Sequence, residues 1–231
     1  MPRVQMTYQV PIPLLYHHQG DFDFALAHLV NFNSIYAKFY REQVAMGRVV
    51  MLDNSIHELG YPLTLDEIKR ADDALGGCTY IIPPDWHGDR LRTQEAVKIA
   101  MEMWPVGKVV PVVQGRSLRE IQDCYEYYCC FGFRKVAIPY RLREMRFDLT
   151  PHDWMGHHFL SFTYVNEIYR MRRFPDASCD TGKPFRFAQN SREIPIATQF
   201  TEEIPKLDMN KADIDSDILH FNLEIIESAA N

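Results

Sequence analysis

The chain has 231 residues, of which 46% are hydrophobic and 24% charged, and its formal net charge is −6. These values are typical of a globular protein and argue against a surface coated in nucleic-acid-binding charge. No apolar run approaches the about 20 residues of a membrane span, and residues 1–6 show no secretory signal. The five cysteines include the adjacent pair Cys129 and Cys130 and predict no disulfide framework, so a cytoplasmic protein is expected, in the host cytoplasm if the chain is phage-encoded.

Short apolar runs alternate with amphipathic patterns along the chain. The predicted strands cover residues 8–14, 24–30, 49–53, 78–82, 108–113, 135–139, 157–162 and 177–180. The predicted helices cover residues 34–46, 64–75, 90–103, 117–130, 164–173 and 214–229. Thr64 and Glu67 form a capping-box pattern, and Gly76 marks the end of the same helix. Pro11 and Pro13 weaken the first strand, and the second would also fit a helix.

Eight strands with helices between most of them predict a parallel sheet covered by helices. A chain of 231 residues divided by eight gives about 29 residues per unit, the lower size range of an eight-stranded α/β barrel. The predicted fold is therefore a compact (β/α)8 TIM-like barrel, a single domain over residues 1–231 with a closing helix at about 211–229. The alternative is an open doubly wound sheet, but its usual GxGxxG turn is absent from the sequence.

Polar residues repeatedly follow the apolar strands, which is how a parallel barrel builds an active site. Asp53, Asp85, Gln114 and Asp180 each stand at or just after the end of a predicted strand. Two carboxylates on facing strands would allow one to attack a sugar carbon while the other moves a proton. Each of the three aspartates could instead stabilise a turn or cap a helix, and Gln114 could bond to a loop backbone.

The basic residues are unevenly distributed. Residues 134–186 hold 10 Lys and Arg against 6 Asp and Glu, a balance of +4, which leaves 15 against 25, or −10, for the remainder. This segment could present a basic face to phosphates, or it could be ordinary solvated helix surface. No metal site is expected, because the cysteines lack CxxC spacing and the adjacent pairs His17-His18 and His157-His158 would point to opposite faces of a strand.

Seven segments, taken in order, resemble the tRNA-guanine transglycosylase superfamily, most closely the phage and bacterial DpdA-type proteins that insert 7-deazaguanines into DNA. They run from about Phe24 to Pro184 and read FALAHLV, VVMLDNSIHELG, IIPPDWHGD, VVPVVQGRSLREIQDCY, FRKVAIPYR, HHFLSF and ASCDTGKP. Each segment alone is weak evidence, whereas the ordered set is fairly specific.

The resemblance implies a role for each strand-end residue. Asp180 corresponds to the nucleophile that attacks the sugar C1′, and Asp53 to the general acid and base. Asp85 and Gln114 correspond to residues that hydrogen-bond the purine edge. The resemblance also assigns to the base site or its surroundings His28, Asn54, Ala137, Ile138 and Pro139.

The chain departs from the tRNA enzymes after the nucleophile segment. Those enzymes carry a zinc subdomain there, whereas this sequence has no cysteine after Cys179. Because that subdomain helps to position tRNA, its absence favours DNA. The expected phosphate contacts are Arg141, Arg143, Arg170, Arg172, Arg173, Lys183 and Arg186.

The sequence therefore predicts a base-exchanging DNA transglycosylase, a glycosyltransferase that replaces guanine by a 7-deazaguanine such as 7-cyano-7-deazaguanine. Its expected partners are DNA and the free base, with no cofactor, no metal and no membrane. The alternatives are a tRNA- or nucleoside-directed enzyme of the same superfamily, an inactive barrel that binds nucleic acid or a partner enzyme, and an unrelated barrel hydrolase or lyase.

Overall fold

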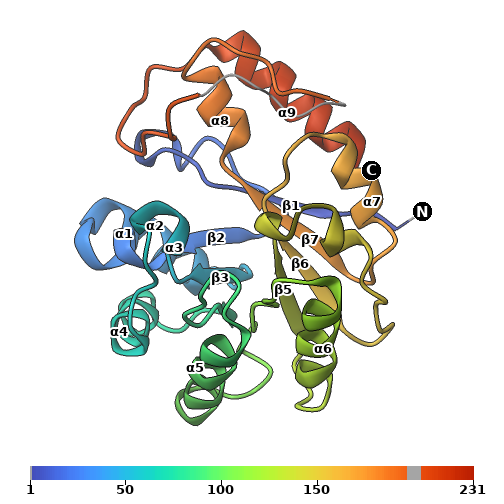
Figure 1. Cartoon of the computed structure of the whole chain (residues 1–231). Coiled ribbons are helices and arrows are strands. Elements are labelled where there is room, and N and C mark those ends of the chain that lie inside the picture. The colour runs from blue at the N-terminus through green and yellow to red at the C-terminus, as the bar shows by residue number, and fades with distance from the viewer. Residues whose placement is uncertain (1, 197–203) are drawn as a thin grey trace.

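A computed structural model describes residues 2–196 and 204–231 and shows a mixed α/β protein with parallel strands. In Figure 1 the strands lie in the middle of the molecule and the helices surround them. The strands are β1 (Gln5–Tyr8), β2 (Asp23–Leu26), β3 (Val50–Asp53), β4 (Tyr80–Ile81), β5 (Lys135–Pro139), β6 (Gly156–Leu160) and β7 (Ala177–Thr181).

The strands form two parallel sheets, one in the order β1-β7-β6-β5 and one in the order β2-β3-β4. The register places Thr7 opposite Asp180 and Leu160 opposite Asp180 on the two sides of β7. In the other sheet Leu26 lies opposite Asp53. All these pairs are parallel, so the carboxyl ends of the strands in each sheet share one edge.

Residues 108–113 connect the two sheets on one side. Val109 bridges to Ile81 of β4, and Val112 bridges to Ala137 of β5. Pro111 interrupts this segment because it has no N–H, although its carbonyl accepts from the Ala137 N–H at 2.9 Å. The expected strand 108–113 is therefore present only as two single bridges.

On the other side β1 and β2 approach each other. The Asp21 N–H donates to the Met6 carbonyl at 2.7 Å, and the Thr7 hydroxyl donates to the Phe22 carbonyl at 2.6 Å. Gly20 permits this approach, since a Cβ at this position would lie 2.4 Å from the Met6 carbonyl oxygen.

The helices begin and end at the residues that their sequence signals indicate. The long ones are α2 (Ser34–Ala45), α4 (Leu65–Leu75), α5 (Arg90–Met103), α6 (Leu118–Cys129) and α9 (Ser216–Ala230). Thr64 and Glu67 form both hydrogen bonds of the predicted capping box on α4, and Gly76 ends this helix with a φ of 84°. The cap of α2 is Asn33, whose side chain accepts from the N–H groups of Ile35 and Tyr36.

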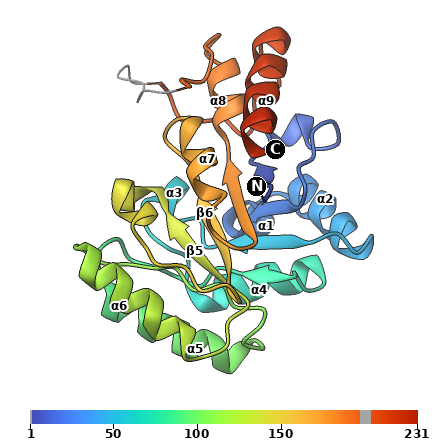
Figure 2. The ribbon, with the colours of Figure 1, turned by 90° about the vertical axis from the view of Figure 1, so that its right-hand side faces the viewer.

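The short helices occupy the connections. They are α1 (Ala27–Phe32), α3 (Ile56–Leu59), α7 (Asn166–Met171) and α8 (Lys183–Ala188), with 3-10 turns η1 (Ile12–Leu14) and η2 (Tyr140–Phe147). Helix α9 packs against α8, and the Val4 N–H donates to the Ala230 carbonyl at 3.0 Å, so the last helix lies beside the first strand (Figure 2).

Two predicted strands at the start of the chain were wrong. The strand expected at 8–14 lies earlier, as β1, and its proline-containing part forms η1, because prolines cannot donate to a sheet but fit the first turn of a helix. The strand expected at 24–30 ends at Leu26 and continues directly as α1, so both periodicities seen in this segment were real. Among the residues that the structure describes, no helix has the length and apolar character needed to cross a bilayer.

Candidate functional site

Asp180 lies near the end of β7 and is 3% exposed. Its carboxylate is held from two neighbouring strands: the Gln9 side-chain amide, just after β1, donates to Oδ2 at 3.1 Å, and the Ser161 N–H, just after β6, donates to Oδ1 at 3.2 Å. The Gln9 N–H also donates to the Thr181 carbonyl at 2.9 Å, which fixes the backbone beside it. The side chain is therefore oriented by rigid elements, as a reacting carboxylate requires.

A third group approaches Asp180 from inside the molecule. The His158 Nε2 lies 3.4 Å from the Asp180 Oδ1, and the His158 ring stacks on Phe24 with a centroid distance of 5.6 Å. His158 is fully buried, and burial lowers the pKa of its imidazole, so the ring is neutral at pH 7.

The tautomer of His158 follows from the groups behind it. The Lys135 ammonium can only donate, and it donates to the Ser178 hydroxyl oxygen at 3.2 Å. That hydroxyl lies 3.1 Å from the His158 Nδ1, closer than its other acceptor, the His157 carbonyl at 3.5 Å. Because this contact is the shorter one, we assign the hydroxyl proton to the contact with Nδ1 and the proton of the neutral ring to Nε2, on the side of Asp180.

Asp53 ends β3, and its carboxylate turns back on its own loop. Oδ2 accepts from the Ser55 N–H at 2.7 Å, with Ser55 in the left-handed region at a φ of 64°. This is the turn contact expected if Asp53 were structural, yet one carboxylate oxygen takes no part in it. Burial, followed by the charge of Glu58, raises the pKa of Asp53 well above its usual range.

Glu58, on α3, is a site residue that sequence reasoning missed. Its Oε2 is buried and has no hydrogen-bond partner among the described residues. Burial raises the pKa of Glu58 to about 7, and the charge of Asp180 adds to the shift. Asp180 also raises the pKa of Asp53. Such mutual effects require that the three carboxyls lie near one another, and the site is therefore acidic and partly protonated at neutral pH.

Asp85 is held by two side-chain amides, Asn54 and Gln114, which the resemblance also assigned to the base site. Asn54 donates to the Asp85 Oδ1 at 2.8 Å and to the Pro83 carbonyl at 2.8 Å, and Gln114 donates to the Asp85 Oδ2 at 2.6 Å. The side-chain oxygen Oε1 of Gln114 accepts from the Gly88 N–H at 3.0 Å. Each Asp85 oxygen still has a second lone pair, so the group keeps the capacity to accept hydrogen bonds from a ligand. Burial raises the pKa of Asp85.

The remaining residues assigned to the base site differ in what they can offer. His28 is half-buried on α1, where its N–H donates to the Ser55 hydroxyl at 3.2 Å and its ring Nδ1 has no partner among the described residues. Ala137 uses its N–H and carbonyl in bonds to Pro111 and Val113. Ile138 lies inside β5, and Pro139 ends it, so of these three residues Pro139 is the one at the carboxyl end.

The predicted phosphate-binding residues are divided by the structure. Arg141 and Arg143 are exposed on η2, directly after the carboxyl end of β5. Arg141 is close enough to the site to lower the pKa of His57, after the larger effect of burial. Lys206, exposed and not predicted, acts on both His57 and Glu58. Arg141 and Lys206 therefore lie near the acidic residues.

Three of the other predicted cations, on and just after α7, make their contacts elsewhere. Arg170 pairs with Glu144, Arg172 donates to the Ala229 carbonyl and Arg173 donates to the Leu149 carbonyl. Arg172 and Arg173 follow α7 and precede β7, so they lie towards the amino end of that strand. Lys183 has its pKa lowered to about 8 by burial, and Arg186 donates to the carbonyls of Ile204 and Pro205.

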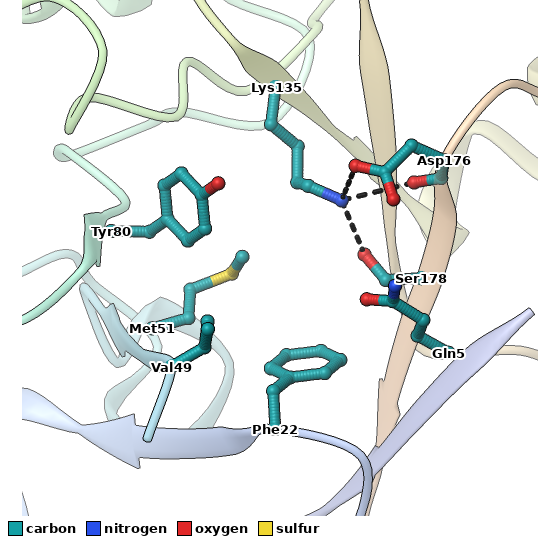
Figure 3. A pocket seen from close by; sticks show the side chains of 8 residues that line it. All are labelled: Gln5, Phe22, Val49, Met51, Tyr80, Lys135, Asp176 and Ser178. Carbon is teal, nitrogen blue, oxygen red and sulfur yellow. Dashed lines mark hydrogen bonds and ion pairs between the residues drawn. The ribbon is translucent and has the colours of Figure 1, made fainter. Parts of the chain in front are cut away.

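Two cavities among the described residues have linings that include neither Asp53 nor Asp180. One, of about 230 Å³, lies at the amino ends of the strands (Figure 3). There the buried Lys135 ammonium contacts the Asp176 carboxylate at 2.9 Å, and the opposite wall is apolar. The cavity is lined by Gln5, Phe22, Val49, Met51, Tyr80, Lys135, Asp176 and Ser178. A second, of about 170 Å³, lies beside β1 and α9.

Sequence signals for the missed residues were weak. Glu58 follows Asp53 inside a motif that was singled out, but it belongs to a short helix with no clear pattern. His158 was predicted to face away from its neighbour, and it does: His157 contacts Tyr125 and Phe174, whereas His158 contacts Phe22 and Phe24. Its approach to Asp180 depends on pairing between β6 and β7, which a sequence does not give.

No protein-family model matches the chain, and no curated protein matches it either. The geometry of the site and the sequence resemblance are therefore the grounds on which a function can be proposed.

Proposed function

We propose that this protein is a (β/α)8 barrel enzyme that exchanges guanine in DNA for a 7-deazaguanine base. The closed barrel is supported by the contacts at both junctions of the two sheets. Residues 109 and 112 bridge β4 to β5, and the Met6 carbonyl accepts from Asp21 between β1 and β2. With residues 109–112 counted as the eighth strand, all the strand-end residues belong to one mouth, where barrel active sites are built.

The observation that carries the proposal is the acidic cluster at the carboxyl ends of β3 and β7. Asp53 and Asp180 are buried at the ends of different strands, and the charge of Asp180 raises the pKa of Asp53. One carboxyl is thereby favoured in its protonated form beside another that is oriented by two donors, the Gln9 side-chain amide and the Ser161 N–H. This is the division between acid and nucleophile that exchange at a glycosidic carbon needs.

In the proposed reaction an Asp180 oxygen attacks the deoxyribose C1′ as the C1′–N9 bond breaks. The bonding electrons leave with guanine, which takes a proton from Asp53. The Asp53 carboxylate then removes a proton from the incoming 7-deazaguanine, whose N9 attacks C1′ and releases Asp180. Each proton and electron pair is returned, so no cofactor takes part in the exchange.

Asp85 and Gln114 are the proposed readers of the purine edge. Guanine offers N–H donors on this edge, and the free lone pairs of the Asp85 carboxyl would accept from them. Asn54 and Gln114 fix the carboxyl in the plane that such recognition requires. A deazapurine that keeps the same edge would be bound in the same way.

The target base must leave its stack before Asp180 can reach C1′, at a cost of a few kcal/mol in a duplex. Arg141 and Lys206 lie close enough to act on His57 or Glu58, and Arg143 is exposed on the same 3-10 turn as Arg141, so these groups would contact the flanking phosphates.

The decisive experiment is the Asp180→Asn variant with Asp123→Asn as its control. Asp123 is exposed on α6, away from the strand ends, and its substitution changes the net charge by the same amount. We expect wild-type protein and the control to incorporate labelled 7-deazaguanine into DNA and to form a trapped covalent adduct. Asp180→Asn should do neither, and full exchange by this variant would refute the nucleophile.

The substrate is tested by competition between labelled DNA, tRNA and free nucleoside. Exchange confined to tRNA or nucleoside would replace DNA as the substrate while retaining the mechanism. Nucleic-acid binding that is unchanged in Asp53→Ala and Asp180→Ala, with no exchange by wild-type protein, would indicate an inactive barrel. Mass spectrometry of nucleosides from DNA of the organism that encodes the chain would identify the inserted base.

A further inference from the structure

A second group of chemically reactive side chains lies away from the acidic cluster, between the end of α6 and the loop before β6. It consists of Glu126, Cys129 and His152, whose potential ligand atoms all lie within 4.8 Å of one another. Over residues 2–196 and 204–231, this is the one trio of His, Cys, Asp or Glu that meets this distance.

Glu126 and Cys129 are presented together by the helix. They are three residues apart near the end of α6, so their side chains lie on the same face. The Glu126 Oε1 accepts from the Gln122 amide at 2.7 Å, which fixes the carboxylate and leaves Oε2 directed at His152, 3.0 Å from its Nε2.

His152, in the loop before β6, packs against the same face of α6. Its N–H donates to the Tyr125 hydroxyl at 2.9 Å, and its ring stacks on the Tyr125 ring at a centroid distance of 5.6 Å and an interplanar angle of 4°. The Thr150 N–H donates to Oε1 of the Gln122 side chain at 3.2 Å, and Gln122 lies one helical turn before Glu126. The loop is therefore anchored along α6, and the imidazole is oriented towards Cys129 and Glu126.

We propose that Glu126, Cys129 and His152 bind a zinc ion that clamps this loop to α6. A thiolate, an imidazole and a carboxylate are the three ligand types that zinc takes in proteins, at about 2.0–2.3 Å. Ligand atoms already within 4.8 Å of one another need only small side-chain movements to meet one tetrahedral ion. Binding releases the Cys129 thiol proton to solvent, and a water molecule completes the four ligands.

An ion pair between Glu126 and His152 does not by itself explain why both side chains are held in fixed positions. The side chains of His152 and Glu126 are 38% and 48% exposed, and ion pairs as exposed as this one contribute little to stability. The ordered Tyr125 and Gln122 contacts fix both groups in positions that a solvated pair does not require. Outer partners of this kind orient metal ligands and commonly change affinity about 10–100-fold.

The adjacent cysteines provide a matched test. Cys130 is exposed and its thiol is directed to the Glu126 carbonyl, at 3.6 Å, whereas Cys129 belongs to the trio. Reduced wild-type protein is titrated with Co²⁺ while the thiolate-to-cobalt charge-transfer absorption is recorded, and Zn²⁺ is then added. We expect one equivalent of Co²⁺ to bind with this absorption and Zn²⁺ to displace it.

The variants then separate the proposal from nonspecific thiol binding. Cys130→Ser should keep the absorption, Cys129→Ser should lose it, and His152→Ala should weaken Co²⁺ binding by at least about 10-fold. Circular dichroism of each variant checks that it is folded. Absence of the absorption in wild-type protein, or its loss in Cys130→Ser with retention in Cys129→Ser, overturns the proposal.

Discussion

The two ends of the parallel strands carry different electrostatics although the same strands supply both. At the amino ends Lys135 is buried against the Asp176 carboxylate, which is largely exposed, beside an apolar wall. At the carboxyl ends Asp53, Glu58 and Asp85 all have raised pKa values, with burial as the largest cause. At the amino ends a positive and a negative group are paired, whereas at the carboxyl ends several acidic groups are buried together.

The proposed function offers a physical reason for this difference. Several carboxyls buried together destabilise a fold, because desolvation and mutual repulsion both oppose their ionisation. Such an arrangement is found where the perturbed pKa values serve chemistry. The chain Lys135–Ser178–His158–Asp180 joins the two ends through the interior, so a change at the balanced end is expected to reach the acidic one.

The largest expected effect comes from Asp53→Asn at the acidic end. An amide cannot donate and recover the proton of the exchange, so the rate should fall by about 10²–10⁴-fold. Base exchange is measured with labelled 7-deazaguanine, and Asp123→Asn, an exposed aspartate on α6, is the control. Exchange at the wild-type rate would remove Asp53 from the mechanism and leave the acidic cluster without a proton donor.

Glu58→Gln tests how far the acidic cluster lowers the free energy of unfolding, and how this effect changes with pH. The pKa of Glu58 is about 7 in the folded protein, raised from 4.5. Below pH 4.5 the group is protonated in the folded and unfolded states, and the stability of the fold is then highest with respect to this group. That stability is lost as the pH rises through 7, because the unfolded state ionises more readily. Glutamine does not ionise, so the variant should match wild type at pH 4 and be more stable by about 1–3 kcal/mol at pH 8.

Urea unfolding at both pH values measures this difference. Glu95→Gln, an exposed residue on α5, should show no comparable change between pH 4 and pH 8. A Glu58→Gln variant that is less stable than wild type at pH 8 would contradict the raised pKa.

Ser178→Ala breaks the chain that joins the two ends. It removes the donor to the His158 Nδ1 and one acceptor of Lys135, both buried, and should destabilise the protein by about 1–3 kcal/mol. Nitrogen NMR of His158 should show that the proton no longer occupies Nε2 alone. Ser228→Ala on the exposed face of α9 is the control, and an unchanged His158 spectrum would argue against the assigned tautomer.

Lys135→Met, at the amino ends of the strands, should have the smallest effect on the free energy of unfolding. Replacing a buried cation by an apolar side chain of similar length is often neutral, and Asp176, 56% exposed, can return to water. We expect the free energy of unfolding to change by about 1 kcal/mol or less. A loss of several kcal/mol would mean that the amino end depends on its ion pair.

Much of the local structure was determined by the sequence. Helix α5 and strand β5 have the predicted bounds, and the capping box of Thr64 fixes α4, because these signals act between residues a few positions apart. The strand ends that carry Asp53 and Asp180 were also located within a residue, since each follows a short apolar run bounded by turn residues. At the level of a mixed, parallel α/β protein the predicted fold is confirmed.

Only the tertiary structure decided which side chains meet. Gln9 and Ser161 reach Asp180 because β1 and β6 pair with β7 from opposite sides, although the three strands are separated along the chain. Glu58 joins the acidic cluster through a short helix, and His152 approaches Cys129 from a loop, and neither segment has a periodic pattern. Local propensities act over a few residues, whereas pKa shifts and ligand clusters arise from packing between distant segments, which no single stretch of sequence encodes.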